Sequence, residues 1–189
     1  VQTCALPISY RLVGEEANRR PVAFALNGGP GYASAWLHLG ALGPWRLDMD
    51  VAAAIPTAPP VLVENADTWL EFADLVFLDP AGTGYGRILG GDDVRKSLWS
   101  VNGDVNALAV TIRRWVEANG RLASPKYIVG ESYGGFRAPK IARLLQTDQG
   151  VGVDGLVLVS PVLDFRRFDQ GESIFQHVAR LPSYAATAR

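Results

Sequence analysis

Short apolar runs alternate with longer amphipathic segments along most of the chain. Between residues 102 and 119 the apolar positions repeat every 3.6 residues, and Gly120 follows as a stop, which predicts an amphipathic helix. Residues 136–145 predict a second helix, with Pro139 near its first turn or at a kink. Four runs, each followed by asparagine, aspartate, glycine or proline, have the length of β-strands: 21–26 (PVAFAL), 74–78 (DLVFL), 126–129 (KYIV) and 155–160 (GLVLVS).

This order of elements predicts the fold class. Apolar strands that alternate with amphipathic helices indicate an α/β fold with a mostly parallel sheet and helices on both faces. We expect the first and last of the four strands to be buried. Residues 52–60, rich in alanine and proline, are predicted as irregular surface, and after Pro161 no clear apolar period remains.

The first eight residues are interpreted separately from the rest. Residues 1–8 (VQTCALPI) read like a translated sequencing adapter, so we hypothesise that they are not native and that the folded domain covers residues 9–189. The alternative is a short natural edge strand. The nucleotide record decides, because codons that do not match adapter sequence would reject the hypothesis.

The amino-acid composition argues against some classes of binding partner. The 189 residues are 48% hydrophobic and 20% charged with a net charge of −1, which argues against nucleic acid or an anionic membrane surface as the main partner. No apolar run approaches the roughly 18 residues that span a bilayer. Cys4 is the only cysteine, so no internal disulfide forms, and with only His38 and His177 beside it neither a metal site nor a cofactor is expected.

A glycine-flanked serine follows the third predicted strand. Residues 130–134 (GESYG) match the pattern G-x-S-x-G, and Gly135 comes next. This pattern places a serine on a very sharp strand-to-helix turn with its hydroxyl exposed, and small neighbours are needed because the backbone packs closely there. The strand before and the helix after favour Ser132 as the nucleophile of an α/β-hydrolase over a surface serine on a glycine-rich turn.

A second glycine-rich segment precedes Ser132 by about a hundred residues. Residues 27–31 (NGGPG) directly follow the first predicted strand. In α/β-hydrolases the oxyanion hole combines the N–H after the nucleophile with another from such a loop. Tyr133 would supply the first donor and this loop the second, and each donor is worth about 3–4 kcal/mol in the transition state.

Three segments together resemble the serine carboxypeptidase family. They occur in the family's order, as NGGPG at 27–31, DPAGTGYGR at 79–87 and GESYGG at 130–135. The approach to the second segment, residues 64–78, is also similar, and LHLGALGP at 37–44 is closer to the bacterial branch. The resemblance covers residues 21 to about 165 and implies an α/β-hydrolase fold and a peptide substrate.

The resemblance also implies roles for six residues. Ser132 would attack the scissile carbonyl and form an acyl-enzyme, with the backbone N–H groups of Gly29 and Tyr133 holding the oxyanion. A carboxyl group can hold another carboxylate only while the two share a proton, so an acidic working pH is implied. Relatives are usually exported or kept in acidic compartments. The residues implied in binding the substrate's free C-terminal carboxylate are Asn27, Gly28 and Glu131.

The sequence departs from the family pattern at two points. Many members place a second acidic residue where Ala41 stands, which puts the exopeptidase preference and the acid optimum in question. The triad order of this fold is Ser, Asp, His, with the last two after later strands. Only one convincing strand follows Ser132, and the acidic and histidine residues in the right order come too early, namely Asp154, Asp164, Asp169 and His177.

These departures lead to the expectation of an incomplete domain. His38 precedes the nucleophile, and a surface or structural role is favoured for His177. We therefore expect an inactive N-terminal fragment whose sheet lacks its C-terminal strands and whose triad Asp and His are missing. Another α/β-hydrolase, such as a proline-directed aminopeptidase or an esterase, and a non-catalytic α/β binding module are the alternatives.

Overall fold

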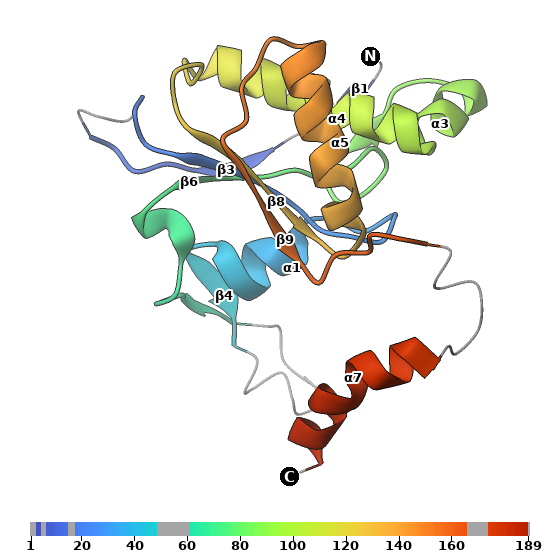
Figure 1. Cartoon of the computed structure of the whole chain (residues 1–189). Helices are drawn as coiled ribbons and strands as arrows, with labels where there is room; N and C mark the ends of the chain where they lie inside the picture. Colours follow the sequence, from blue (N-terminus) through green and yellow to red (C-terminus); the bar gives the residue numbers. More distant parts are fainter. Residues whose placement is uncertain (1–2, 5–6, 15–17, 49–60, 166–173, 189) are drawn as a thin grey trace.

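The computed structural model describes residues 3–4, 7–14, 18–48, 61–165 and 174–188. A five-stranded sheet forms its centre (Figure 1). Across the sheet the strands run in the order β2 (Ile8–Tyr10), β6 (Asp74–Phe77), β3 (Val22–Leu26), β8 (Lys126–Glu131) and β9 (Gly155–Val159). All neighbours are parallel except β2, which pairs antiparallel with β6. The predicted mostly parallel sheet is confirmed.

The register of the two central strands brings distant loops together. β3 and β8 pair in parallel from Val22 opposite Lys126 to Leu26 opposite Gly130. The carboxyl ends of both strands therefore lie side by side. The loop that begins at Asn27 and the turn at Ser132 leave the sheet at the same edge.

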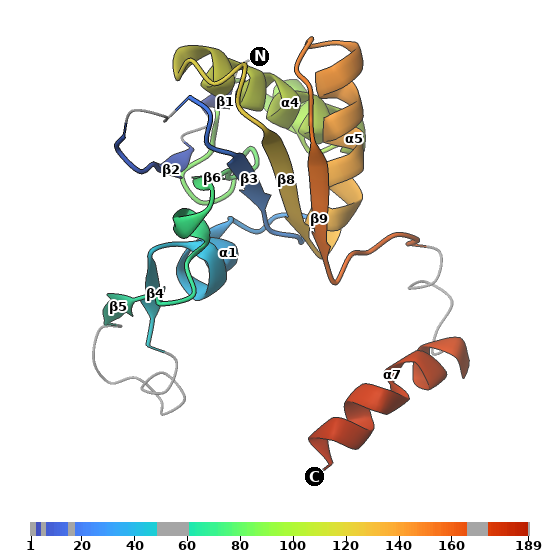
Figure 2. The same cartoon turned by 60° about the vertical axis from the view of Figure 1, so that its left-hand side comes forward.

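Helices cover both faces of the sheet, as predicted (Figure 2). The long helices α4 (Val101–Ala118) and α5 (Tyr133–Thr147) pack on one face, and the short α1 (Ala35–Leu37) and the π-helical turn η1 (His38–Leu42) lie on the other. Successive side chains of β3 point alternately to the two faces of the sheet. Val22, Phe24 and Leu26 join the core under α4 and α5, and Ala23 and Ala25 join the core under α1 and η1.

The sequence explains where helix α4 begins and where it ends. The Ser100 side chain accepts a hydrogen bond from the N–H of Gly103 at 3.1 Å and so caps the first turn. At the other end Gly120 has a φ of 64°, and the N–H of Arg121 donates to the carbonyl of Val116 at 2.8 Å. The apolar residues that give this segment its 3.6-residue repeat are buried, namely Val105, Leu108, Ala109, Ile112 and Val116.

Helix α5 begins at Tyr133, three residues before its predicted start. Pro139 is therefore the seventh residue of the helix and lies in the second turn. The earlier start places the first N–H groups of the helix directly beside Ser132, which has consequences for the site described below.

Smaller elements complete the described part of the chain. β4 (Trp45–Leu47) pairs antiparallel with β5 (Leu62–Glu64), and β1 (Thr3–Cys4) pairs with β7 (Arg87–Ile88). The remaining short helices are the 3-10 turn η2 (Trp69–Glu71) and α3 (Asp92–Leu98). The predicted irregular segment 52–60 lies outside the described residues. The adapter origin of residues 1–8 stays a prediction.

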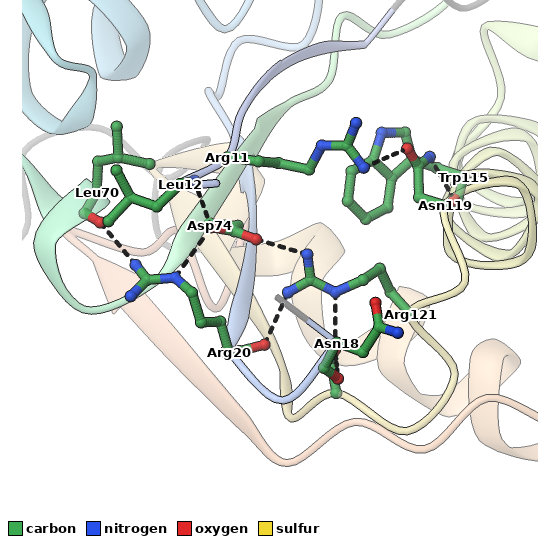
Figure 3. Close-up of polar contacts among 10 residues, drawn as sticks. Arg11, Leu12, Asn18, Arg20, Leu70, Asp74, Trp115, Asn119 and Arg121 are labelled. Atoms are coloured by element: carbon green, nitrogen blue, oxygen red, sulfur yellow. Dashed lines mark hydrogen bonds and ion pairs between the residues drawn. The ribbon is translucent and has the colours of Figure 1, made fainter. Parts of the chain in front are cut away.

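A buried ion cluster joins the amino-terminal ends of the central strands (Figure 3). Asp74, the first residue of β6, is fully buried and accepts hydrogen bonds from Arg121 at 2.5 Å and from Arg20 at 3.2 Å. Arg121, itself 1% exposed, also donates to the carbonyl of Arg20 and to the hydroxyl of Ser124. Because the strands are parallel, this cluster lies at the opposite end of the sheet from Ser132.

The last part of the described chain departs from expectation. Residues 155–159 form the predicted strand β9, but the prediction that it is buried was wrong, since the side chains from Leu156 to Val159 are 36–40% exposed. β9 pairs with β8 on one side, and no described strand pairs with its other edge. Helix α7 (Ile174–Thr187), which the apolar pattern did not predict, lies away from the sheet in both views (Figures 1 and 2). Within the described residues, no helix is long and apolar enough to cross a bilayer.

Candidate active site

Ser132 occupies a sharp turn between β8 and α5. Its φ and ψ are 55° and −118°, a backbone conformation that costs about 1–3 kcal/mol for a residue with a side chain. Gly130 and Gly134 approach so closely that a Cβ on Gly130 would clash with the carbonyl oxygen of Gly134. The N–H of Ser132 donates to the carbonyl of Val159 at 2.9 Å, which ties the turn to β9. The structure thus has the strand, tight turn and helix that the glycine-flanked pattern predicts.

The glycine-rich loop after β3 packs directly against this turn. A Cβ on Gly28 would lie 2.7 Å from the Cβ of Ser132 and 2.8 Å from the backbone nitrogen of Tyr133. Gly29 has a φ of 109°, in the region that favours glycine. Two segments about a hundred residues apart in the sequence are therefore in contact.

Glu131 links the turn to the loop through its carboxylate. Oε2 accepts hydrogen bonds from Nδ2 of Asn27 and from the N–H of Gly28, both at 3.2 Å. Asn27 is 3% exposed, and its Oδ1 accepts from the N–H of Leu37 at 3.0 Å. The amide of Asn27 is oriented by this contact, so its donor nitrogen is presented to Glu131.

The segment at 79–87 is connected to the loop at 27–31 by hydrogen bonds through Ser34. The hydroxyl of Ser34 accepts from the N–H of Asn27 at 3.3 Å, and the N–H of Ser34 donates to Oδ1 of Asp79 at 2.8 Å. Oδ2 of Asp79 accepts from the N–H of Tyr85 at 2.9 Å. The three sequence segments that carry the family resemblance therefore form one connected hydrogen-bonded unit.

Five of the six predicted site residues line an open cavity of about 430 Å³, whereas Tyr133 borders the second hollow described below. Asn27, Gly28 and Gly29 line it together with Glu131 and Ser132. Three residues that the sequence analysis did not assign form the rest of the wall, namely Tyr32, Trp36 and Leu37. Tyr32 and Trp36 are more than 60% exposed, and their position just after the loop was the only sequence signal for them.

A second hollow of about 600 Å³ borders the same loop. Pro30 and Gly31 border it, and Tyr133 and Phe165 contribute aromatic surface, with ring centroids 5.7 Å apart. Burial raises the pKa of the Tyr133 hydroxyl. Asp104 and Arg137, which also line this hollow, were not predicted from the sequence, because nothing in the apolar pattern pairs residues 33 positions apart on two helices.

The histidines differ in their surroundings. His38 is 9% exposed, contacts the Tyr10 hydroxyl through Nε2 at 2.7 Å and packs against Phe77 with ring centroids 4.7 Å apart. Burial lowers the pKa of His38, and the Asp79 charge partly opposes that shift. These contacts give His38 a place in the core under α1 and η1. His177 lies exposed on α7.

The acidic candidates after Ser132 are dispersed. Asp154 accepts the backbone N–H of Lys126 at 2.7 Å, at the end of β8 remote from Ser132. Asp164 follows β9, and Asp169 lies outside the described residues. Among the residues that the structure describes, no three His, Cys, Asp or Glu side chains gather in a way that could hold a metal ion.

Sequence comparison finds relatives among the carboxypeptidases. The chain is 33% identical over 131 residues to a pheromone-processing carboxypeptidase KEX1 of Metarhizium robertsii, a match that covers 68% of this chain and 19% of that protein. It is 28% identical over 179 residues to serine carboxypeptidase-like 29 of Arabidopsis thaliana, covering 87% of this chain and 34% of the relative. The chain thus spans about a fifth to a third of these relatives. Both are eukaryotic, so the closer likeness to the bacterial branch stays a prediction.

Structure comparison supports the fold. The crystal structure of Kex1(Δ)p, a prohormone-processing carboxypeptidase from Saccharomyces cerevisiae, matches with a TM-score of 0.66 at 21% identity, covering 93% of this chain and 41% of that one. The profile of the serine carboxypeptidase family matches residues 10–174, most of the chain. With this match and with the three motif segments joined around Ser132, the chain belongs to the serine carboxypeptidase family.

Proposed function

We propose that the protein to which this chain belongs is a serine-type carboxypeptidase that releases C-terminal residues from peptides. Ser132 attacks the carbonyl carbon of the last peptide bond, and the N–H groups of Gly29 and Tyr133 hold the oxyanion. The amine of the released residue leaves with a proton, and water then hydrolyses the acyl-enzyme. Asn27, Gly28 and Glu131 bind the free carboxylate of the substrate.

One observation carries this proposal. The cavity that holds Ser132 also holds Glu131, whose carboxyl group is fixed by two donors from the loop at 27–28. A peptide with its last carbonyl at Ser132 would present its terminal carboxylate to a group a few ångströms away. An esterase needs no such group, whereas an aminopeptidase would pair the Glu131 carboxylate with the ammonium group of its substrate, so the blocked free acid and the unblocked amide distinguish the two peptidases.

The proposed role of Glu131 implies that substrate binding depends on pH. Two carboxylates repel each other unless they share a proton, so binding of a free C-terminus strengthens as the pH falls. Position 41, where many relatives carry a second acidic residue, holds Ala41, whose carbonyl accepts from Asn65. Glu131 would therefore act without that second carboxyl group.

The general base is proposed to lie outside residues 1–189. His38 is committed to Tyr10 and Phe77, and His177 lies on a helix away from the sheet. A serine without an oriented base is a poor nucleophile. We therefore expect the 189-residue chain alone to show no useful peptidase turnover.

The test compares the full-length natural protein with the 189-residue chain and with a Ser132→Ala variant of the full-length protein. The substrates are an N-blocked dipeptide, the same dipeptide as its C-terminal amide, an unblocked dipeptide amide and a simple ester. We expect the full-length protein to hydrolyse the blocked free acid and to prefer it to its amide. Ser132→Ala should lower kcat by at least about 10⁴-fold.

Each alternative gives a different result. Faster cleavage of the unblocked dipeptide amide would indicate an aminopeptidase, and ester hydrolysis without peptide hydrolysis would indicate an esterase. No turnover of any substrate by the full-length protein would favour a non-catalytic binding module. Ordinary turnover by the 189-residue chain would contradict the proposed location of the base.

A further inference from the structure

A buried ion pair between helices α4 and α5 lies next to the candidate site. Arg137, in the fifth position of α5, is 1% exposed, and its Nε donates to Oδ2 of Asp104 on α4 at 2.6 Å. The Asp104 side chain is 10% exposed. Burial raises the pKa of the Asp104 carboxyl, and the Arg137 guanidinium opposes that rise. Each partner thus compensates the charge of the other inside the core.

Arg137 makes a second contact that reaches the loop. Its Nη1 donates to the backbone carbonyl of Asn27 at 3.2 Å. The N–H of the same peptide unit, which belongs to Gly28, donates to Oε2 of Glu131 at 3.2 Å. One peptide plane is therefore held at both ends, with a cation on its carbonyl and a carboxylate on its N–H. Bonds in such a chain polarise one another, so the cation strengthens the N–H as a donor.

A third contact reaches the helix start. The guanidinium carbon of Arg137 lies 4.7 Å from the centroid of the Tyr133 ring, one turn earlier on α5. Side chains four residues apart on a helix meet in this way, and a cation over an aromatic face is attracted to it. Arg137 therefore touches both segments that are proposed to supply oxyanion donors.

We propose that Arg137, held in place by Asp104, is a positioning residue that orients the Asn27–Gly28 peptide toward Glu131 and so sets the preference for a free C-terminal carboxylate. This inference rests on the proposed function. A purely structural ion pair would change the thermal stability of the protein and leave that preference intact. The two roles can therefore be separated.

The decisive variant removes both charges together. Replacing a buried ion pair by apolar residues of similar size is often neutral or stabilising, whereas removing one partner leaves an unpaired buried charge. In the full-length natural protein, Arg137→Met combined with Asp104→Leu should therefore keep its Tm. We expect the ratio of kcat/KM for the blocked dipeptide acid to that for its amide to fall about tenfold, equivalent to about 1.4 kcal/mol.

A milder variant and a matched control accompany it. Arg137→Lys keeps the charge near Asp104, but one ammonium group cannot reproduce the planar fork that reaches Asp104 and the Asn27 carbonyl together. It should lower the same ratio by several-fold. Arg113→Lys makes the same exchange on α4 at an exposed residue paired with Glu117 at 2.6 Å, and it should leave the ratio unchanged.

The outcomes are distinct. An unchanged ratio in a folded double variant overturns the positioning role, and so does an unchanged ratio in Arg137→Lys if the double variant does not fold. If neither variant folds, the pair is a folding determinant and the proposal is rejected. A wild-type protein that shows no preference for the free acid would instead reject the proposed function, whatever the variants do.

Discussion

At the scale of single residues, the site depends on how closely the backbone of one segment approaches another. The Gly28 Cα lies where any side chain would enter the space of Ser132 and Tyr133. Ser132 itself holds a conformation that residues with a side chain rarely adopt, and its neighbours fix it there. Small changes in side-chain size at these positions should therefore act on activity more than on folding.

Gly28→Ala should reduce kcat/KM of the full-length protein by about 100-fold or more. The added methyl would meet the Ser132 Cβ at 2.7 Å, so loop and turn must separate, and misplacements of about 1 Å carry costs of this size. Gly152→Ala is the matched control, since a Cβ there meets nothing within 4 Å and no positive φ is involved. Steady-state kinetics with the blocked dipeptide measures both, and equal activities would contradict the close approach.

His38 should make the stability of the protein depend on pH. Burial lowers its pKa, whereas a histidine in the unfolded chain titrates near 6.5. Below about pH 6.5 the unfolded state therefore binds more protons than the native state, and stability falls as the pH falls. Denaturation curves between pH 7 and pH 5 should show a shallower loss in His38→Gln, which keeps a partner for Tyr10. Parallel losses in both proteins would rule this effect out.

At the scale of elements, the central strands are joined at their two ends by different chemistry. The carboxyl ends of β3 and β8 carry the candidate site, and the amino-terminal ends carry the cluster of Arg20, Asp74 and Arg121 (Figure 3). Asp74 accepts hydrogen bonds from Arg20, which precedes β3, and from Arg121, which precedes β8. It therefore ties the start of β6 to both of these segments. This end of the sheet is expected to matter for stability alone.

Asp74→Ala should lower the free energy of unfolding by about 3–5 kcal/mol, because it leaves Arg121 buried without its partner. Asp67→Ala is a suitable control, since the Asp67 carboxylate is 88% exposed and its contact with Arg46 is 3.9 Å long. That exposed pair should contribute less than about 1 kcal/mol. Urea denaturation gives both values. A loss below about 1 kcal/mol for Asp74→Ala would show that the cluster is not a main support of the sheet.

Elements with a regular period could be predicted from the sequence. The apolar runs at β3, β6 and β8 and the repeating face of α4 correspond to the structure within a few residues. The burial of β9 could not be predicted, because exposure depends on what lies beside a strand and not on its own residues. The same holds for Arg137 and Asp104, whose contact depends on how two helices cross. Five of the six predicted site residues line one cavity and Tyr133 borders the second hollow, and the roles of all six stay predictions.

At the scale of the whole molecule, the described sheet is asymmetric. On one side β2 closes the sheet with a short antiparallel strand, and on the other β9 presents a row of apolar side chains 36–40% exposed. An unpaired apolar edge is a template for pairing with other chains. We therefore expect the 189-residue chain to aggregate when it is expressed alone.

Val157→Lys should raise the soluble fraction of the 189-residue chain several-fold. A charge on an exposed edge strand disfavours intermolecular pairing, and Val157 is 36% exposed opposite Val129 of β8. Leu122→Lys adds the same charge at a residue that is 58% exposed but lies outside the sheet, and it should have little effect. Light scattering and soluble yield measure both variants. An equal increase in soluble fraction for both variants would show that the added charge, and not its place on the edge strand β9, causes the effect.

The support of the glycine-rich loop by Ser34 and Asp79 limits how this site can be moved to another scaffold. Grafting residues 27–31 alone onto a different hydrolase would transfer the glycines without the hydroxyl and the carboxylate that hold them from behind. A transplanted site would need Ser34 and the turn from Asp79 to Tyr85 as well. The smallest portable unit is therefore two segments from two parts of the chain, residues 27–34 and 79–85.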